Sequence, residues 1–256
     1  TCAVVVHGGW AAHRNAVWSD PDRLWEATLR ESPNNSRVWM NAGLWNLRRG
    51  DYTGALRRFQ RSYELNPRYH LNVVNMAIAH DAAGDRAAAD ARFDEAAALA
   101  PKDWQVPYWR GVRLLKRGLP FEAAASFRLA KALDARNLLV RVGLAQALAA
   151  AELPVPLYEC VDETNAIFPN DPAIAAAAAA FPEPVRIAAR AAAGTPPSAE
   201  AYAVLSAALF RSAKYVAAVD AARVSVGLDP KCASGWNNLG AALGSLGRFA
   251  EEIDAC

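Results

Sequence analysis

The feature that most constrains this chain is a pattern that recurs every 34 residues. A small residue, a second small residue, an aromatic residue and a proline follow one another at fixed spacing. The positions are Gly43, Ala55, Phe59 and Pro67 in one copy, Ala77, Ala89, Phe93 and Pro101 in the next, and Gly111, Ala123, Phe127 and, in place of proline, Ala135 in the third. A chain with such a period folds as stacked copies of one structural unit, because each copy buries its apolar face against its neighbour.

Each spacing has a steric reason. Paired small residues let two antiparallel helices approach closely, and the aromatic ring fills the gap to the next helix pair. Proline ends the second helix because the residue before it is pushed out of the α region. The chain is 53% hydrophobic and 21% charged, which supplies enough core material to exclude disorder over most of its length. The pattern therefore predicts one helical hairpin per copy.

These motifs resemble the tetratricopeptide repeat (TPR). The resemblance implies an all-α fold, a right-handed α-α superhelix (TPR solenoid) of stacked antiparallel helical hairpins. Four consecutive units cover 36–171 without a gap, and two more, the last incomplete, follow at the end of the sequence. The expected units are 36–69, 70–103, 104–137, 138–171, 199–232 and 233–256.

Residues 172–198 depart from the pattern, because this stretch of 27 residues is seven shorter than a full unit. It is rich in alanine and proline. One interpretation is a shortened helical hairpin that continues the stack, and the other is a flexible linker between two solenoid blocks.

Residues 1–35 also depart from the pattern, as a degenerate N-terminal repeat or a former membrane-proximal segment. Ser19-Asp20-Pro21 is a helix start, with a capping side chain and proline at the first helical position. The string Arg14 to Asp20, followed by Leu24-Trp25, resembles the junction of polytopic O-mannosyltransferase-like membrane proteins, in which a last membrane helix leads into an extracytoplasmic repeat tail. This resemblance favours an extracytoplasmic or extracellular location, with a cytoplasmic one as the alternative.

The search for catalytic chemistry finds no motif. The four histidines are scattered, and GxSxG, HExxH and the phosphate-binding GxxxxGK[ST] are all absent from the sequence. We expect a protein that is not an enzyme, with no cofactor and no metal. The net charge of +2 argues against a nucleic-acid partner. No uninterrupted apolar run reaches about 18 residues, so we expect no membrane span within this chain.

The expected partner is a protein or peptide, bound in the groove that first helices line in solenoids. The TPR resemblance places this lining mainly at the second, fifth, sixth, ninth, twelfth and thirteenth positions of each unit. Asn41, Asn75 and Asn238 share the sixth position, where an amide can both donate to and accept from a peptide backbone. The predicted groove consists of Arg37, Met40, Asn41, Leu44, Arg48, Val74, Asn75, Ile78, Gln105, Tyr108, Trp109, Val112 and Asn238.

The two ends of the sequence carry a second hypothesis. The chain ends within the last repeat, so apolar residues there and at the beginning could meet head-to-tail in a homo-oligomer or polymer. A disulfide between Cys2 and Cys256 of successive protomers is then conceivable in an oxidising compartment. The alternative is that the natural chain continues past Cys256. The residues of these assembly ends are Cys2, Val4, Val6, Leu243, Leu246, Phe249, Ile253 and Cys256.

The sequence therefore predicts a non-catalytic protein-protein interaction scaffold. Two alternatives stay open. One is a structural subunit of an extracellular filament or higher-order assembly, and the other is the extracytoplasmic TPR tail of a membrane glycosyltransferase-like protein.

Overall fold

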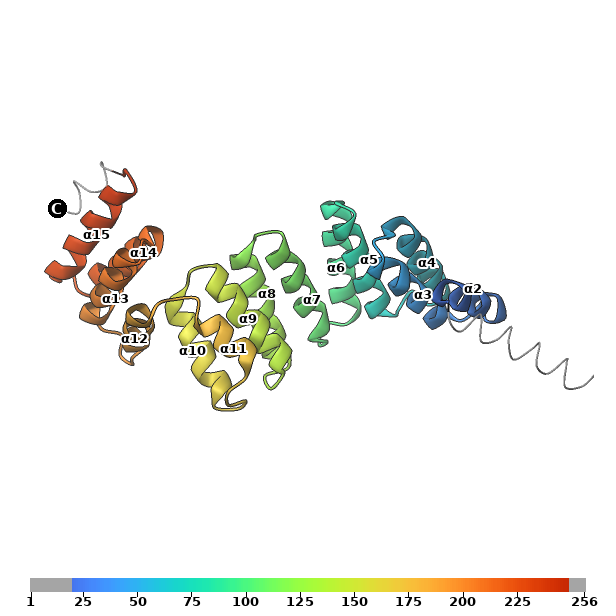
Figure 1. The fold of residues 1–256 in the computed structure, drawn as a ribbon, viewed down its shortest axis with the longest axis horizontal. Coiled ribbons are helices and arrows are strands. Elements are labelled where there is room, and N and C mark those ends of the chain that lie inside the picture. The colour runs from blue at the N-terminus through green and yellow to red at the C-terminus, as the bar shows by residue number, and fades with distance from the viewer. Residues whose placement is uncertain (1–19, 249–256) are drawn as a thin grey trace, which may run out of the picture. The chain divides into compact units, whose positions relative to one another are not determined.

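A computed structural model describes residues 20–248 (Figure 1). Within this range the chain consists of helices joined by short turns and contains no strand. It divides into two compact units, the first ending at Trp109 and the second beginning at Arg110. None of the described helices is long and apolar enough to cross a membrane.

The first unit is built from helices that pack on their neighbours in sequence, α3 along α4, α4 on α5 and α5 along α6. α7 begins in this unit and ends in the second. The helices are α2 (Pro21–Glu31), α3 (Ser36–Arg48), α4 (Tyr52–Leu65), α5 (His70–Ala82), α6 (Arg86–Leu99) and α7 (Gln105–Lys116).

The second unit continues with pairs of the same kind, and α13 packs along α14 as closely as α3 does along α4. Its helices are α8 (Pro120–Leu133), α9 (Leu138–Ala150), α10 (Pro154–Asn165), α11 (Pro172–Ala178), α12 (Glu183–Ala192), α13 (Ala199–Arg211), α14 (Tyr215–Leu228) and α15 (Ala233–Ser245). The described chain is thus an all-α stack of helix pairs in each unit, as the repeat predicts.

The turns inside the pairs follow from local chemistry. Gly50 and Gly84 take φ of +79° and +90°, a left-handed conformation that residues with a side chain rarely adopt. The aspartate after each glycine then starts the second helix. Asp51 Oδ1 accepts from the Gly54 N–H at 2.8 Å, and Asp85 caps α6 in the same way.

The core repeats with the same period as the sequence. The rings of Phe59, Phe93 and Phe127 are at most 1% exposed. A Cβ added at Gly43 would lie 2.5 Å from Cε1 of Phe59, so the small residue at this position is required by the ring beside it. The steric reason proposed for these positions is therefore confirmed in this hairpin.

A few polar side chains are buried between the helices. The Ser62 hydroxyl donates to the carbonyl oxygen of Ser36 at 2.8 Å and joins the end of α4 to the start of α3. Asn72 is 0% exposed, and its Nδ2 donates to the carbonyl oxygen of Phe59 at 2.9 Å. Its Oδ1 is buried and accepts no hydrogen bond from the described chain.

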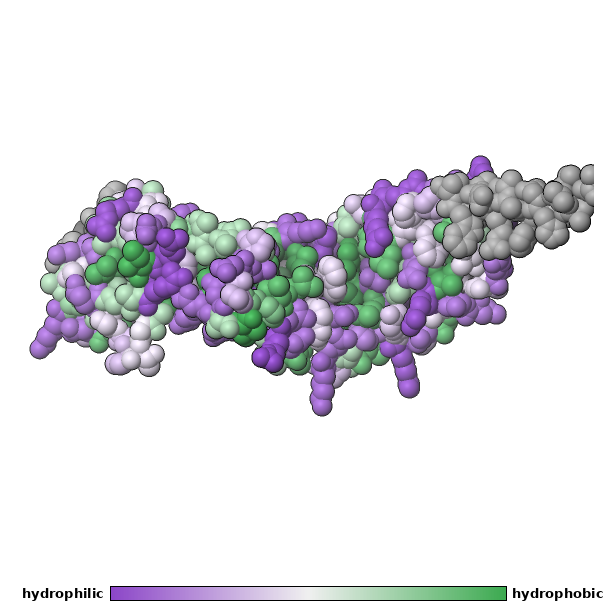
Figure 2. All heavy atoms as spheres, turned by 60° about the horizontal axis from the view of Figure 1, so that its bottom comes forward, coloured by the Kyte–Doolittle hydropathy of each residue, from purple (hydrophilic) through white to green (hydrophobic). Residues whose placement is uncertain are grey.

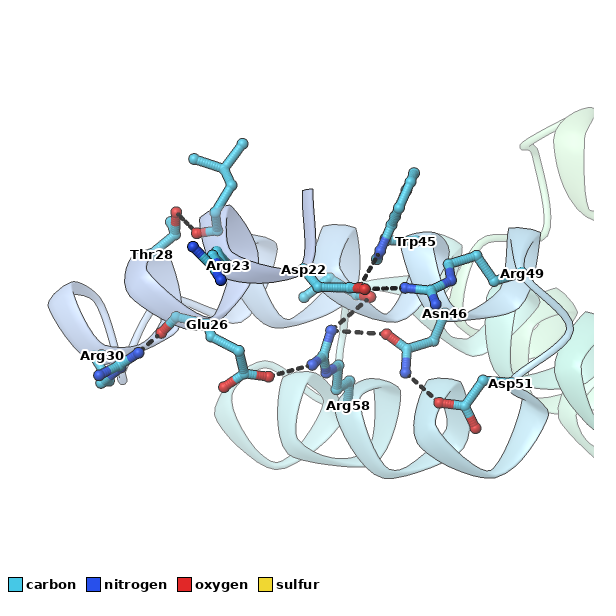
Figure 3. A network of polar contacts seen from close by, with 12 residues as sticks. Asp22, Arg23, Glu26, Thr28, Arg30, Trp45, Asn46, Arg49, Asp51 and Arg58 are labelled. Carbon is cyan, nitrogen blue, oxygen red and sulfur yellow. Dashed lines mark hydrogen bonds and ion pairs between the residues drawn. The ribbon is translucent and has the colours of Figure 1, made fainter. Parts of the chain in front are cut away.

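Polar contacts fasten α2 to the helix pair that follows it (Figure 3). Asp22 Oδ1 accepts from the Trp45 indole N–H at 2.7 Å, and its other carboxylate oxygen pairs with Arg49, whose guanidinium also lies 5.7 Å from the Trp45 ring centroid. The indole hydrogen bond, and after it that of Arg49, lower the pKa of Asp22. The ionised carboxylate is the form that holds α2 in place.

Arg58 in α4 makes the second set of contacts to α2. Its guanidinium pairs with Glu26 at 2.6 Å and donates to Asn46 Oδ1 at 2.7 Å. Asn46 Nδ2 donates in turn to Asp51 Oδ2 at 2.6 Å, and the Gly54 N–H and this amide lower the pKa of Asp51. Leu29 is the one buried residue of α2, and Leu24 and Trp25 are half-buried, so these ionic and polar contacts add to the apolar packing of this helix.

Residues 172–198 form two short helices, α11 and α12, that both contact α10 and otherwise pack on different helices. α11 lies on α9 and α10, whereas α12 lies on α10 and α13. Ile174 and Val185 are each 0% exposed, so both helices bury apolar side chains. The segment contributes to the core of the second unit, although each helix is shorter than those of a full repeat.

Candidate functional site

One stripe of α3 carries two arginines that extend into solvent, together with Leu44, which packs on one side against the core cluster of Met40 and Phe59. Arg37, Asn41, Leu44 and Arg48 are spaced by four, three and four residues, which places them on one side of a helix. The two arginines are exposed, and Asn41 and Leu44 are half-buried. Neither arginine side chain forms an ion pair with the described residues, so both positive charges are available to a ligand.

α5 carries the corresponding stripe of the next repeat, and it contacts α3. Asn75 and Ile78 are half-buried there, three residues apart. Neither Asn41 nor Asn75 makes a side-chain hydrogen bond to the part of the chain that the structure describes. Two amides at the same position of adjacent helices thus keep their donors and acceptors unused. We call this set, Arg37, Asn41, Leu44, Arg48, Asn75 and Ile78, the α3/α5 surface.

The groove prediction is wrong for Met40 and Val74, which are 8% and 1% exposed. Met40 packs in a cluster with Phe59, and Val74 in one with Phe93. The fifth position precedes the sixth by about 100° around the helix, and this rotation carries its side chain into the contact between helices. A partner cannot reach either residue.

Aromatic side chains gather where α7 begins. The Tyr108 ring lies edge-on to those of Trp104 and Trp109, with centroids 5.6 and 5.2 Å apart. Burial raises the pKa of Tyr108, so its hydroxyl stays neutral at physiological pH, whereas Trp109 is 39% exposed. Gln105 begins the helix and is half-buried.

Asp103 holds this beginning of α7 against α5. Its Oδ2 lies 2.7 Å from His70 Nε2, and its Oδ1 accepts from the Gln105 N–H at 2.8 Å. The carboxylate therefore connects the first residues of two successive first helices. Both carboxylate oxygens of Asp103 are engaged in these contacts, so its pairing with His70 serves the structure of the helix pair.

The chemistry of these residues is that of recognition. Amides that can donate and accept, two guanidinium groups and an exposed indole can bind the backbone, carboxylates and apolar side chains of a peptide. Figure 2 shows hydrophobic residues at the surface among hydrophilic ones. Among the described residues, no three His, Cys, Asp or Glu side chains are grouped so that they could hold a metal ion.

Solved structures share this fold of stacked helix pairs. A tetratricopeptide repeat protein from Parabacteroides merdae superposes with a TM-score of 0.51 at 14% identity, covering 91% of this chain and 94% of that one. The chain has the tetratricopeptide-repeat fold. Yeast Tom70 superposes equally well, with a TM-score of 0.51 at 16% identity, over 92% of this chain and 47% of Tom70. At these identities the TPR likeness concerns the fold alone.

The sequence also has a curated relative. The photosystem I assembly protein Ycf3 of Rippkaea orientalis is 31% identical over 110 residues, which are 42% of this chain. The matched segment spans 62% of the length of Ycf3. The sequence matches no model of a known protein family.

The groove residues predicted in the second unit have other surroundings than those of α3 and α5. Asn238 shares the sixth position with Asn41 and Asn75, but its Nδ2 donates to the carbonyl oxygen of Ala203 at 2.9 Å. This amide already links α15 to α13. Val112 is half-buried in the part of α7 that belongs to the second unit.

The prediction of an uncovered C-terminal repeat is wrong for Leu243, which is 2% exposed. α15 packs on both α13 and α14, and these helices cover the face on which Leu243 lies. Leu246 is half-buried. The remaining predicted assembly residues, Cys2, Val4, Val6, Phe249, Ile253 and Cys256, lie outside the described residues, as does most of the junction that resembles O-mannosyltransferase-like proteins.

Sequence reasoning missed an apolar groove in the second unit. It lies between the start of α10 and the pair α13 and α14, and Leu153, Val155, Leu205, Leu209 and Val224 are among its lining residues. The sequence held one hint, the seven-residue deficit of 172–198, because an incomplete unit leaves its neighbours incompletely covered.

Proposed function

We propose that this protein is a non-catalytic scaffold that binds an extended segment of a partner protein on the α3/α5 surface and so helps to assemble a multiprotein complex. The TPR fold supports a role in protein-protein interaction. The relative whose name describes an assembly protein supports the more specific part, the assembly role.

The observation that carries the proposal is the pair Asn41 and Asn75. Polar groups of this kind are usually engaged when they are half-buried, as Asn238 is in the second unit. The side-chain amides of Asn41 and Asn75 lie on adjacent helices and form no hydrogen bond with the described chain, so each presents a donor and an acceptor at the same position of its repeat. An extended peptide offers the same groups along its backbone, at a regular spacing.

The charges of the surface specify the partner further. Arg37 and Arg48 lie at the two ends of the α3 stripe, and both are exposed. Leu44 of α3 and Ile78 of α5 pack against the core and are half-buried, so part of each side chain remains open to an apolar contact. We therefore expect a segment that carries acidic side chains and at least one apolar side chain, because guanidinium groups bind carboxylates with two parallel hydrogen bonds.

The test begins with peptides selected from a random displayed library on the whole protein, which are then synthesised with a fluorescent label. The variant N41A/N75A should weaken their binding about tenfold or more, because each lost hydrogen bond contributes roughly 1 kcal/mol. Fluorescence anisotropy measures the affinity, and circular dichroism checks the helix content.

The matched control is Q146A/N237A, which removes two exposed amides from first helices of the second unit. It should leave binding unchanged. Peptides whose affinity does not respond to N41A/N75A, or selected peptides without acidic residues, would contradict the proposed surface.

A further inference from the structure

We propose a second docking site, the apolar groove of the second unit, and infer that it binds a basic amphipathic segment of another protein. The site differs from the α3/α5 surface in its position and in its charge. It does not depend on the function proposed above.

The groove is partly open and has a volume of about 380 Å³, which falls in the range of ligand-binding pockets. Its floor is apolar. Leu205 and Leu209 of α13 are each 1% exposed, and Ala217 and Ala221 of α14 complete this side. The floor is therefore supported by the core and has a fixed shape.

The opposite wall comes from the start of α10, with Leu153, Val155 and Pro156. Pro154 and Pro156 have no backbone N–H, and no side chain caps this helix end. The wall consequently offers few hydrogen-bond donors. A ligand must bring donors or cations of its own to satisfy the acceptors nearby.

The rim of the groove is acidic. Glu152, Glu159 and Asp220 line it, and Glu152 is paired with Lys214. Glu159 and Asp220 are exposed and make no hydrogen bond or ion pair with the described residues. Burial, together with the Glu159 carboxylate, raises the pKa of the adjacent Tyr202, which therefore stays neutral. Two negative charges thus remain uncompensated beside an apolar floor.

The groove exists because the chain departs from its repeat at 172–198. α11 packs on α9 and α10, and α12 packs on α10 and α13. With both helices short, the start of α10 and the outer face of α14 are left with apolar side chains at the surface. Val216 and Val224 of α14 are 61% and 42% exposed.

The complementary occupant carries aliphatic side chains flanked by at least two lysines or arginines. The aliphatic groups would cover the floor, and the cations would lie against Glu159 and Asp220 on opposite sides of the groove. Such a segment gains affinity and specificity together, because a neutral or acidic apolar peptide would leave the two carboxylates beside it without a counter-charge.

The experiment uses the whole chain and a short labelled peptide of leucine, alanine and lysine in amphipathic helical order. Wild-type protein should bind it in fluorescence anisotropy, and the affinity should fall as salt is raised. E159Q/D220N should weaken binding about fivefold, since each exposed charge contributes modestly. V224K, which adds a cation at the exposed rim, should weaken it as well.

The control E122Q/E183Q removes two exposed carboxylates of the second unit that do not line the groove. It should bind the peptide like the wild type. An equal loss in both double variants would show a general charge effect and overturn the site, as would an unchanged affinity in E159Q/D220N. Self-association of the chain that E159Q/D220N abolishes would overturn the inferred occupant, because a second copy would then fill the groove.

Discussion

Gly43 offers a sharp test of the packing that generates the repeat. A Cβ at this position would lie 2.5 and 2.6 Å from two carbons of the Phe59 ring, and that ring is 0% exposed and cannot turn away. Overpacking costs about 1 to 3 kcal/mol, and contacts this short against a buried ring belong in the upper half of that range, at about 2 to 3 kcal/mol. The better helix propensity of alanine offsets about 1 kcal/mol of this cost. We expect G43A to destabilise the first unit by about 1 to 2 kcal/mol.

The cost has a natural upper limit, because Ala77 occupies the same position of the next repeat beside Phe93. Helix pairs with a methyl group at this position therefore exist in the same chain, with a spacing that accommodates it. The penalty at Gly43 is the free energy needed to move α3 and α4 apart, because these helices pack more closely than a pair with alanine at this position. F59L should relieve the clash, so G43A/F59L should lose about 1 kcal/mol less than the sum of the two single variants.

Urea unfolding followed by tryptophan fluorescence measures the stability of the first unit. Seven of the eight tryptophans lie at or before Trp109, so most of the signal comes from this unit. The control is G227A, in the last turn of α14, where an added Cβ meets nothing within 4 Å. It should be neutral or slightly stabilising. A G43A protein as stable as the wild type, or strictly additive effects of G43A and F59L, would refute the steric reasoning.

Two further outcomes follow from the titrating groups. The pKa values of Asp22 and Asp51 are lowered in the folded chain, so their stabilising effect is complete above their ordinary pKa of about 4 and is lost as pH falls through the lowered values. The urea midpoint of the first unit should therefore fall below pH 4, and D22N/D51N should show a smaller fall; an equal one would contradict this assignment. Among the buried thiols, burial raises the pKa of Cys160, whereas hydrogen bonds from Ser225 and Ser234 lower that of Cys232. Iodoacetamide should alkylate Cys232 before Cys160 in the native protein, as peptide mass mapping would show, and faster reaction of Cys160 would contradict this order.

The repeat made most of the fold predictable. Its period depends on residues that act locally, such as Gly50 in its turn and Phe59 between neighbouring helices, so a sequence pattern records them directly. The helices α3, α5 and α13 begin at Ser36, His70 and Ala199. Short-range sterics fixes these boundaries, and short-range sterics is what a repeat preserves.

The sites were less predictable, for a physical reason. Whether Met40 lies in a groove or in the core depends on a rotation of about 100° relative to Asn41, and family positions do not distinguish the two. The groove of the second unit is bordered by Glu159 and Asp220, which are far apart in sequence and line the same groove only in the folded chain. No local pattern encodes that arrangement.

Asn72 gives the stack something that apolar packing alone does not. Its Nδ2 reaches the carbonyl oxygen of Phe59 in one alignment of α5 with α4, while its Oδ1 already lies buried without a partner. If α5 slid by one turn, Asn72 Nδ2 would also lose its hydrogen-bond partner, and burying this unpaired donor would cost about 1 to 3 kcal/mol. In a chain whose repeats are similar enough to pair in the wrong order, this asparagine distinguishes the correct neighbour from its copies.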